Sequence, residues 1–155
     1  MKEQYATTQS EPEALHDRMI RRRFSDHFSA LLFLEQGRLR LAESDLEIEG
    51  PALCFWPHHT HANVSLDAGS RARILGLSDT ILLDAIGARS ESVHLRMLVE
   101  SPFQACLTDL QIQGQVTALF DWFMSEIKNA EGQSPMSLAA FLRLMLIGAL
   151  RLYSP

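Results

Sequence analysis

Residues 38–49 read RLRLAESDLEIE, and this stretch decides the fold class. Leucine or isoleucine alternates with charged residues on both sides of a short polar segment, which is typical of two antiparallel strands. With a tight turn at Glu43-Ser44, apolar residues face apolar residues and each arginine faces a glutamate: Leu41 with Leu46, Leu39 with Ile48, Arg40 with Glu47, and Arg38 with Glu49. A slip of one residue would set leucine against glutamate, so the sequence predicts a hairpin of well-specified register.

Further strand signals surround this hairpin. Apolar or alternating runs of strand length occur at residues 31–34, 52–56, 61–66 and 71–77. Glycine- or proline-containing turns separate most of them. Six or seven short strands at this spacing predict a small antiparallel, cupin-like (jelly-roll) β-barrel over residues 24–78. Residues 1–23 are interpreted as an N-terminal tail or arm.

The chain from residue 79 onward has a helical pattern. Asp79 can cap a short helix that ends at Gly87. Apolar residues at positions 116, 119, 120, 123, 124 and 127 follow the spacing of an amphipathic helix within residues 103–128. We expect residues 79–155 to form a helical subdomain that is continuous with the barrel, so that the chain is a single domain.

The last predicted helix, residues 136–153 with Ser134 or Ser137 as its cap, is apolar almost all round. Such a helix must be covered on more than one side. It is either a central core helix or a helix with one face on its own domain and the other in a homodimer. We favour the homodimer, with an interface formed by the residues on the far side of the helix: Leu144, Ile147, Leu150 and Arg151.

Composition limits the function classes. The length of 155 residues fits one domain, since domains run roughly 100–200 residues. Lys and Arg number 14 and Asp and Glu number 19, a net charge of −5, which argues against a free-standing nucleic-acid binder. Cys54 and Cys106 have no partners at metal-ligand spacing. The N-terminus has no apolar signal region, and the apolar stretch 138–152 is shorter than the roughly 20 residues that span a bilayer. We therefore expect a soluble cytoplasmic protein without a membrane contact.

The chemistry is concentrated in residues 54–63, CFWPHHTHAN. In an extended segment His59 and His61 would share a face and could reach one metal ion, with His27 as a third ligand. Alternatively, one histidine is hydrogen-bonded inside and the others are solvated. In a third interpretation Trp56 stacks on an organic ligand, and His61 and Asn63 supply polar contacts. Elsewhere, the run Arg21-Arg22-Arg23 is typical of a solvated surface, with an anion contact as the less favoured alternative.

The order of these motifs resembles a known family. The turn Trp56 to His61, entered by a strand that follows Gly50, resembles the second conserved stretch of cupins. The apolar strand ending at Gly37, the turn from Pro57 to His61 and the later helices are similar to the N-terminal effector domain of AraC-type transcription regulators. The resemblance spans roughly residues 20–153.

This resemblance implies a function. It implies effector sensing by the barrel and homodimerisation by the last helix, with no enzymatic activity and no cofactor or metal. The implied effector contacts are His27, Trp56, His59, His61 and Asn63. Their polar and aromatic chemistry admits sugars, aromatic acids or acyl compounds.

Two departures from the family patterns matter. The first cupin motif, His-x-His followed by Glu, is absent, since the sequence has Asp26-His27-Phe28. This absence disfavours the alternative function, a stand-alone metal-dependent cupin enzyme of the dioxygenase or isomerase type. The family's C-terminal helix-turn-helix module is also absent, so we expect DNA binding only through a domain that is missing from this chain. The net charge of −5 is consistent with that absence.

Overall fold

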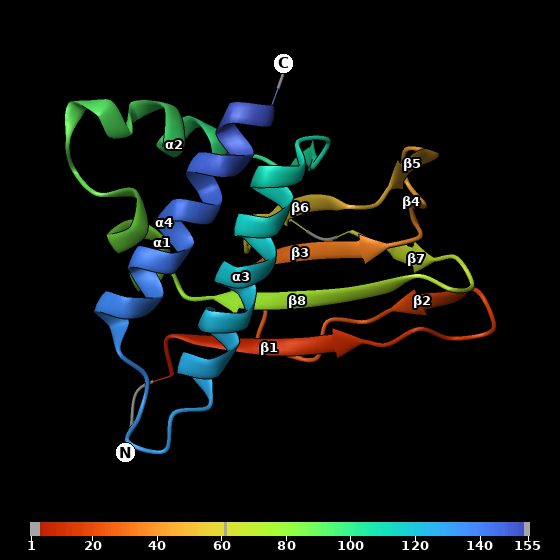
Figure 1. Ribbon diagram of the computed structural model, residues 1–155, viewed down its shortest axis with the longest axis horizontal. Helices are drawn as coiled ribbons and strands as arrows, with labels where there is room; N and C mark the ends of the chain where they lie inside the picture. Colours follow the sequence, from red (N-terminus) through yellow and green to blue (C-terminus); the bar gives the residue numbers. More distant parts are fainter. Residues whose placement is uncertain (1–3, 61, 154–155) are drawn as a thin grey trace.

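The computed structural model describes residues 4–60 and 62–153, and its strands form two antiparallel sheets (Figure 1). The five-stranded sheet has the order β1-β8-β3-β6-β9, and the four-stranded sheet has the order β2-β7-β4-β5. The strands are β1 (Ala6–Glu11), β2 (Arg18–Ile20), β3 (Ser29–Gln36), β4 (Arg38–Leu41), β5 (Leu46–Glu49), β6 (Ala52–Trp56), β7 (Val64–Leu66), β8 (Arg71–Leu77) and β9 (Phe103–Cys106). The predicted fold class, mainly antiparallel β followed by helices, is confirmed. The described strands form two separate sheets rather than one closed barrel.

The hairpin of β4 and β5 has the predicted register in every pair. Its turn is longer than expected, because residues 42–45 connect the strands and Asp45 takes a φ of 54°. The ion pair between Arg38 Nη2 and Glu49 Oε1, at 3.0 Å, lies on the exposed face, where such a pair contributes only about 0–1 kcal/mol. Burial of Leu39 and Ile48 on the opposite face therefore sets the register.

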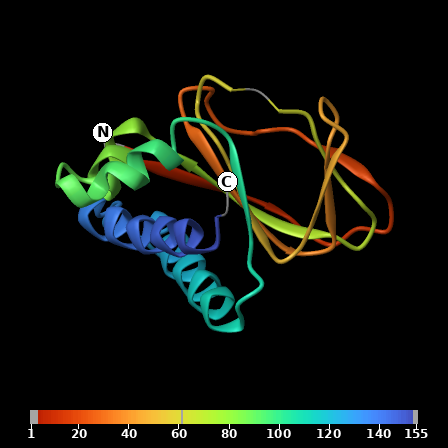
Figure 2. The ribbon, with the colours of Figure 1, turned by 90° about the horizontal axis from the view of Figure 1, so that it is seen from above.

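The five-stranded sheet is the middle layer of the molecule, with helices on one face and the four-stranded sheet on the other (Figure 2). Successive side chains of a strand point to opposite faces. One set packs on the helices and forms, with them, the helix-facing core: Leu31, Phe33, Leu53, Phe55, Leu75 and Leu77. The other set packs on the smaller sheet and forms, with it, the inter-sheet core: Ala30, Leu32, Leu34, Ala52, Cys54, Trp56, Ala72 and Ile74. Burial on both faces explains why β3 and β6 are continuous apolar runs.

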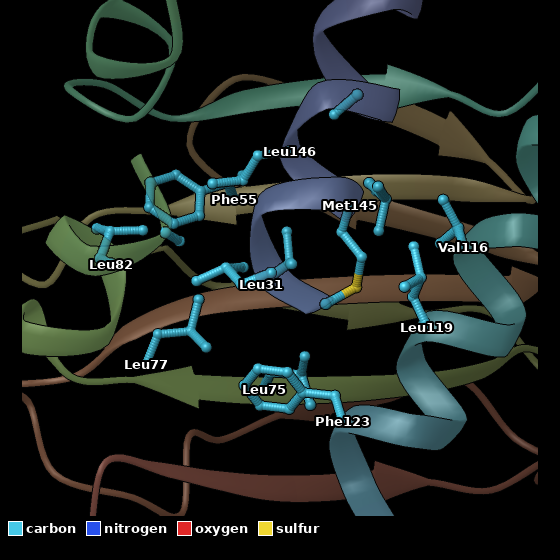
Figure 3. Packing of buried hydrophobic residues seen from close by; sticks show 14 of the residues in the cluster. Leu31, Phe55, Leu75, Leu77, Leu82, Val116, Leu119, Phe123, Met145 and Leu146 are labelled. Atoms are coloured by element: carbon cyan, nitrogen blue, oxygen red, sulfur yellow. The ribbon is translucent and has the colours of Figure 1, made fainter. Parts of the chain in front are cut away.

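Large side chains fill the helix-facing core (Figure 3). Leu31, Phe55 and Leu75 of the sheet meet Met145 of the last helix and Phe123 of the helix before it. All five are fully buried, at 0% exposure. At about 25 cal/mol per Å² of apolar surface, this core provides most of the burial that holds the helices on the sheet.

Two parts of the chain differ from the sequence prediction. Residues 1–23 are not a tail, because β1 pairs with β8 and β2 pairs with β7. Residues 103–106, predicted as helix, form β9 at the edge of the large sheet, paired with β6. The β domain thus takes strands from both sides of the predicted range 24–78. The first strand, ATTQSE, lacks apolar alternation, and β9 is too short to show a period.

The helices are α1 (Asp79–Ile86), α2 (Val93–Leu98), α3 (Leu110–Ile127) and α4 (Pro135–Leu152), with a 3₁₀ turn η1 (Ser90–Ser92). The cap of α1 is Ser78 rather than Asp79, since the Ser78 hydroxyl accepts a hydrogen bond of 3.2 Å from the backbone N–H of Ile81. Of the two candidate caps of α4, Ser134 takes the role and accepts from the N–H of Ser137 at 3.3 Å.

The last helix, α4, packs its buried face on the sheet. The buried residues of that face are Leu138, Ala139, Leu142, Met145, Leu146, Gly148 and Ala149. By length and composition alone α4 could also cross a membrane. Its packing in the helix-facing core accounts for the same apolar composition.

Two polar side chains tie the helical layer to the strands. Gln133, just before α4, hydrogen-bonds the backbone of β1: its Oε1 accepts from the N–H of Tyr5 at 2.9 Å and of Ala6 at 3.1 Å, and its Nε2 donates to the Ala6 carbonyl at 2.8 Å. Arg73 of β8 lies 2.6 Å from Asp121 of α3 and stacks over Phe120, at 5.5 Å from the ring centre. These contacts fix α3 and α4 relative to the sheet.

Candidate functional site

A cavity opens into the inter-sheet core. Its lining comes from both sheets and from the segment that connects β2 to β3: Ile20, Arg22, Phe24, Ala30, Leu32, Trp56, Ala62, Val64 and Ile74. The cavity volume is about 50 Å³, whereas sites for organic ligands usually measure about 300–1,000 Å³. An organic ligand therefore enters only if one wall moves outward.

Residues 20–24 form one wall of this cavity, and we call this wall the lip. Ile20, Arg22 and Phe24 line the cavity, as expected when an extended segment turns every second side chain to one face. Phe24 lies against Gly76 of β8, where an added Cβ would come within 2.9 Å of the Phe24 ring. The missing side chain at Gly76 thus makes room for Phe24 over the sheet.

Arg22 brings a charge to the lining, and within residues 4–60 and 62–153 it is the one charged side chain there. Its Nη1 donates a hydrogen bond of 3.1 Å to the Phe28 carbonyl, and its guanidinium lies 5.3 Å from the centre of the Phe24 ring. Burial lowers the pKa of Arg22 from its ordinary value, while the charge of Asp26 acts in the opposite direction. The group stays a cation, held in a partly desolvated position.

The predicted effector residues are not gathered around this cavity. Trp56 lines it, whereas His27, His59 and Asn63 are exposed and lie outside the lining. His61 lies outside the described residues. The prediction assumed a strand over 61–66, but β7 begins at Val64, so Ala62 and Asn63 lie before the strand and its alternation does not extend to them.

The cavity residues that the prediction missed had a sequence signal. Ile20, Arg22 and Phe24 alternate with Arg21 and Arg23, which places one arginine between two apolar residues on the same face. The three adjacent arginines are interpreted from the sequence as one charged run. Such a run is typical of a solvated surface, so the alternation was overlooked.

No grouping of three or more His, Cys, Asp or Glu side chains able to hold a metal ion occurs within residues 4–60 and 62–153. His58 instead pairs with Asp79 at the start of α1, with 3.4 Å between Nδ1 and Oδ1. The ring of His59 lies 5.4 Å from that of His58, without a shared carboxylate ligand in the described structure. The geometry gives no support to the metal-dependent cupin enzyme.

The outer face of α4 forms a second candidate surface. Leu144, Ile147 and Arg151 line a groove together with Trp122 of α3, and Leu150 lies with Ile147 along a neighbouring groove toward α1 and α2. Leu144 is 54% exposed and Trp122 is 60% exposed. Arg143 of α4 donates hydrogen bonds of 2.6 and 2.9 Å to the carbonyls of Ala85 and Asp84 at the end of α1.

Comparison with solved structures relates the chain to ToxT. No protein-family model matches the sequence, and no curated protein matches it. ToxT from Vibrio cholerae O395, bound to (E)-4-(8-methylnaphthalen-1-yl)but-3-enoic acid, matches with a TM-score of 0.62 at 10% identity, over 95% of this chain and 57% of ToxT. ToxT from V. cholerae strain SCE256, bound to an unsaturated fatty acid, matches with a TM-score of 0.59 at 12% identity, over 97% of this chain and 56% of ToxT.

The chain has the fold of these ToxT structures. It spans a little over half of the ToxT chain, so the comparison concerns one part of that protein. The order of strands and helices that the sequence shares with AraC-type effector domains is thereby confirmed at the level of fold. At 10–12% identity the likeness extends to the fold alone.

Proposed function

We propose that this chain is the effector-sensing and dimerisation domain of an AraC-type, cytoplasmic transcription regulator. The observation that carries the proposal is the cavity between the two sheets, in a fold shared with ToxT, an AraC-family regulator. The site is placed where a bound molecule would separate or hold together the two sheets. DNA binding would belong to a further domain, since this chain spans only 57% of the ToxT chain.

The effector is a small and mostly apolar molecule. Eight of the nine lining side chains are hydrocarbon or aromatic, so a sugar would leave most of its hydroxyl groups without partners. Trp56 offers a flat apolar wall, and Ala30 leaves space beside it. The ligands named with ToxT, an unsaturated fatty acid and an aryl butenoic acid, have this apolar character.

Tryptophan fluorescence tests the effector site directly. The chain holds two tryptophans, and Trp122→Phe leaves Trp56 as the only reporter. We expect saturable changes in Trp56 emission with a C16 monounsaturated fatty acid and none with a pentose. The matched control is Trp56→Phe, in which the remaining Trp122 lies on the helical layer and reports no effector. Equal responses of both variants would contradict the inter-sheet site.

The outer face of α4 is the proposed homodimer interface. A monomer exposes Leu144 and Trp122 there, side by side with Ile147, and a second copy would cover them. Arg151 would lie at the rim, where a charge remains solvated. An effector that favours one spacing of the two sheets would shift the population of helix arrangements, and thereby the position of the attached DNA-binding domains.

Sedimentation tests the dimer. Leu144→Glu places a charge in the proposed interface, and we expect it to convert a dimer into a folded monomer. Leu83→Glu is the matched control, since Leu83 is also exposed, at 66%, but lies on α1 away from this groove. A monomeric parent chain at high micromolar concentration would overturn the interface.

A further inference from the structure

Gln9 and Arg22 form one assembly at the lip of the cavity. Gln9 of β1 is buried, at 5% exposure, although it is an amide. Its Nε2 donates to the Arg21 carbonyl at 2.8 Å, and its Oε1 accepts from the Arg23 N–H at 2.8 Å. The one side chain therefore holds the backbone on both sides of Arg22, much as a neighbouring strand would.

Further contacts hold this arrangement in place. Gln9 Nε2 also donates to Glu11 Oε1 at 3.0 Å, and Glu11 lies 3.6 Å from the guanidinium of Arg23. Glu11 thus neutralises Arg23 and leaves Arg22 without a carboxylate within ion-pair distance, in the part of the chain that the structure describes. A buried, well-connected polar network is rigid, because each broken bond would leave a desolvated group. The three adjacent arginines therefore differ in role: the Arg21 backbone accepts from Gln9, Arg22 lines the cavity, and Arg23 pairs with Glu11.

We propose that Arg22 recognises the carboxylate of an otherwise apolar effector, and that Gln9 is the positioning residue that aims Arg22 at it. This inference rests on the proposed function, because it names the effector class of the same cavity. Arg22 lines the cavity and gives a hydrogen bond to one protein carbonyl, so further N–H donors of its five are free for a ligand. A carboxylate matches the planar fork of a guanidinium with two parallel hydrogen bonds.

The rest of the lining favours a single carboxylate over a larger anion. Among the lining residues that the structure describes, Arg22 is the one cation, so it balances one negative charge. A dianionic phosphate would place a second charge among Ile20, Phe24 and Val64, where no donor compensates its desolvation. The hydrocarbon part of an acid would instead replace lip contacts with contacts to Leu32 and Trp56.

Calorimetric titration of the parent chain with a pair of ligands tests this inference. The probes are a C16 monounsaturated fatty acid and the primary alcohol of the same chain. We expect the parent to prefer the acid by about 10- to 100-fold, the range of a hydrogen bond to a charged group. Arg22→Met should abolish that preference and leave the affinity for the alcohol unchanged. Arg96→Met, the same substitution at an exposed arginine of α2, is the matched control and should keep the preference.

Gln9→Met tests the positioning role. The methionine keeps the bulk of Gln9 and removes its three hydrogen bonds. We expect the acid preference to fall by about 3- to 10-fold with little change for the alcohol, because Arg22 keeps its charge but loses its fixed aim. Arg22→Lys keeps the positive charge and should retain part of the preference for the acid. If residue 22 had a purely structural role, lysine would not restore that preference.

The outcomes separate this inference from the proposed function. Equal binding of acid and alcohol by the parent, or an acid preference that survives Arg22→Met, would overturn the carboxylate site and leave the apolar effector site standing. Binding of neither ligand would overturn the proposed function itself. If circular dichroism shows that Arg22→Met does not fold, Arg22→Gln replaces it under the same criteria.

Discussion

The two faces of the five-stranded sheet differ in how completely they are filled. Toward the helices, Phe33, Phe55, Phe120 and Phe123 are fully buried, at 0–2% exposure, and pack with leucines. Toward the smaller sheet, the same strands present Ala30, Ala52 and Ala72, and the cavity opens beside the first of these. Alternate residues of one strand thus build a solid core and a potential binding site. Stability belongs mainly to the first face, and the proposed function assigns ligand recognition to the second.

The largest expected effect is a loss of stability on the filled face. Phe55→Ala should lower the free energy of unfolding by about 3–5 kcal/mol, because the helix-facing core cannot collapse into the space. Ile74→Val on the cavity face should cost only about 0.5–1.5 kcal/mol. Urea unfolding of both variants provides the comparison, and equal losses would remove the distinction between the two faces.

Much of this two-sided sheet could be predicted from the sequence. The hairpin pairs of residues 38–49 and the run 52–56 depend on local alternation or on continuous apolar residues, which the sequence displays directly. Strands β1 and β9 could not be predicted, because tertiary pairing at the sheet edges stabilises them rather than any apolar pattern of their own.

The site was less predictable for a different reason. Its residues come from five strands, β2, β3, β6, β7 and β8, and from two connecting segments that supply Arg22, Phe24 and Ala62. They come together only when both sheets are in place. His58 and His59 are exposed on the turn after β6, whereas Trp56 at the end of that strand lines the cavity. The carboxylate-binding role proposed for Arg22 depends on the tertiary contact of its backbone neighbours with Gln9, which lies 13 positions away in sequence.

An intermediate effect is expected from filling the cavity. Ala30→Val adds two methyl groups beside Trp56, where the free volume is about 50 Å³. Stability should change by less than about 1.5 kcal/mol, whereas effector affinity should fall at least tenfold, or about 1.4 kcal/mol. Titration with the fatty acid and urea unfolding measure the two quantities. A variant that loses stability but keeps its affinity would place the effector elsewhere.

The smallest effect at neutral pH concerns the two thiols. Burial raises the pKa of the Cys54 thiol to about 12, with a smaller contribution from Cys106. Cys54 should resist a thiol reagent at pH 8 until the protein unfolds, while the exposed Cys106 reacts in the native state. Cys106→Ser isolates the buried thiol, and rapid native labelling of that variant would show that the inter-sheet core opens readily.

The pH dependence has a definite sign. The ordinary thiol pKa of 9.0 applies to the unfolded chain, so the unfolded state loses its proton first as the pH rises. The contribution of Cys54 to stability is therefore complete below about pH 9 and is lost between about pH 9 and pH 12. Cys54→Ala should remove this part of the alkaline decline measured by urea unfolding.

The amide of Gln133 makes β1 a mechanical link between distant parts of the molecule. One end of the strand is held by that amide beside α4, and further along it Gln9 holds the lip. Because an extended strand resists changes in its length, we expect a displacement of the lip to shift β1 as a unit. That shift would reach Gln133 in the connection between α3 and α4. This link runs along the edge strand of the five-stranded sheet, which is paired with β8. Strand β1, which the sequence analysis assigns to an N-terminal arm, would thus transmit a displacement from an occupied cavity to the helices.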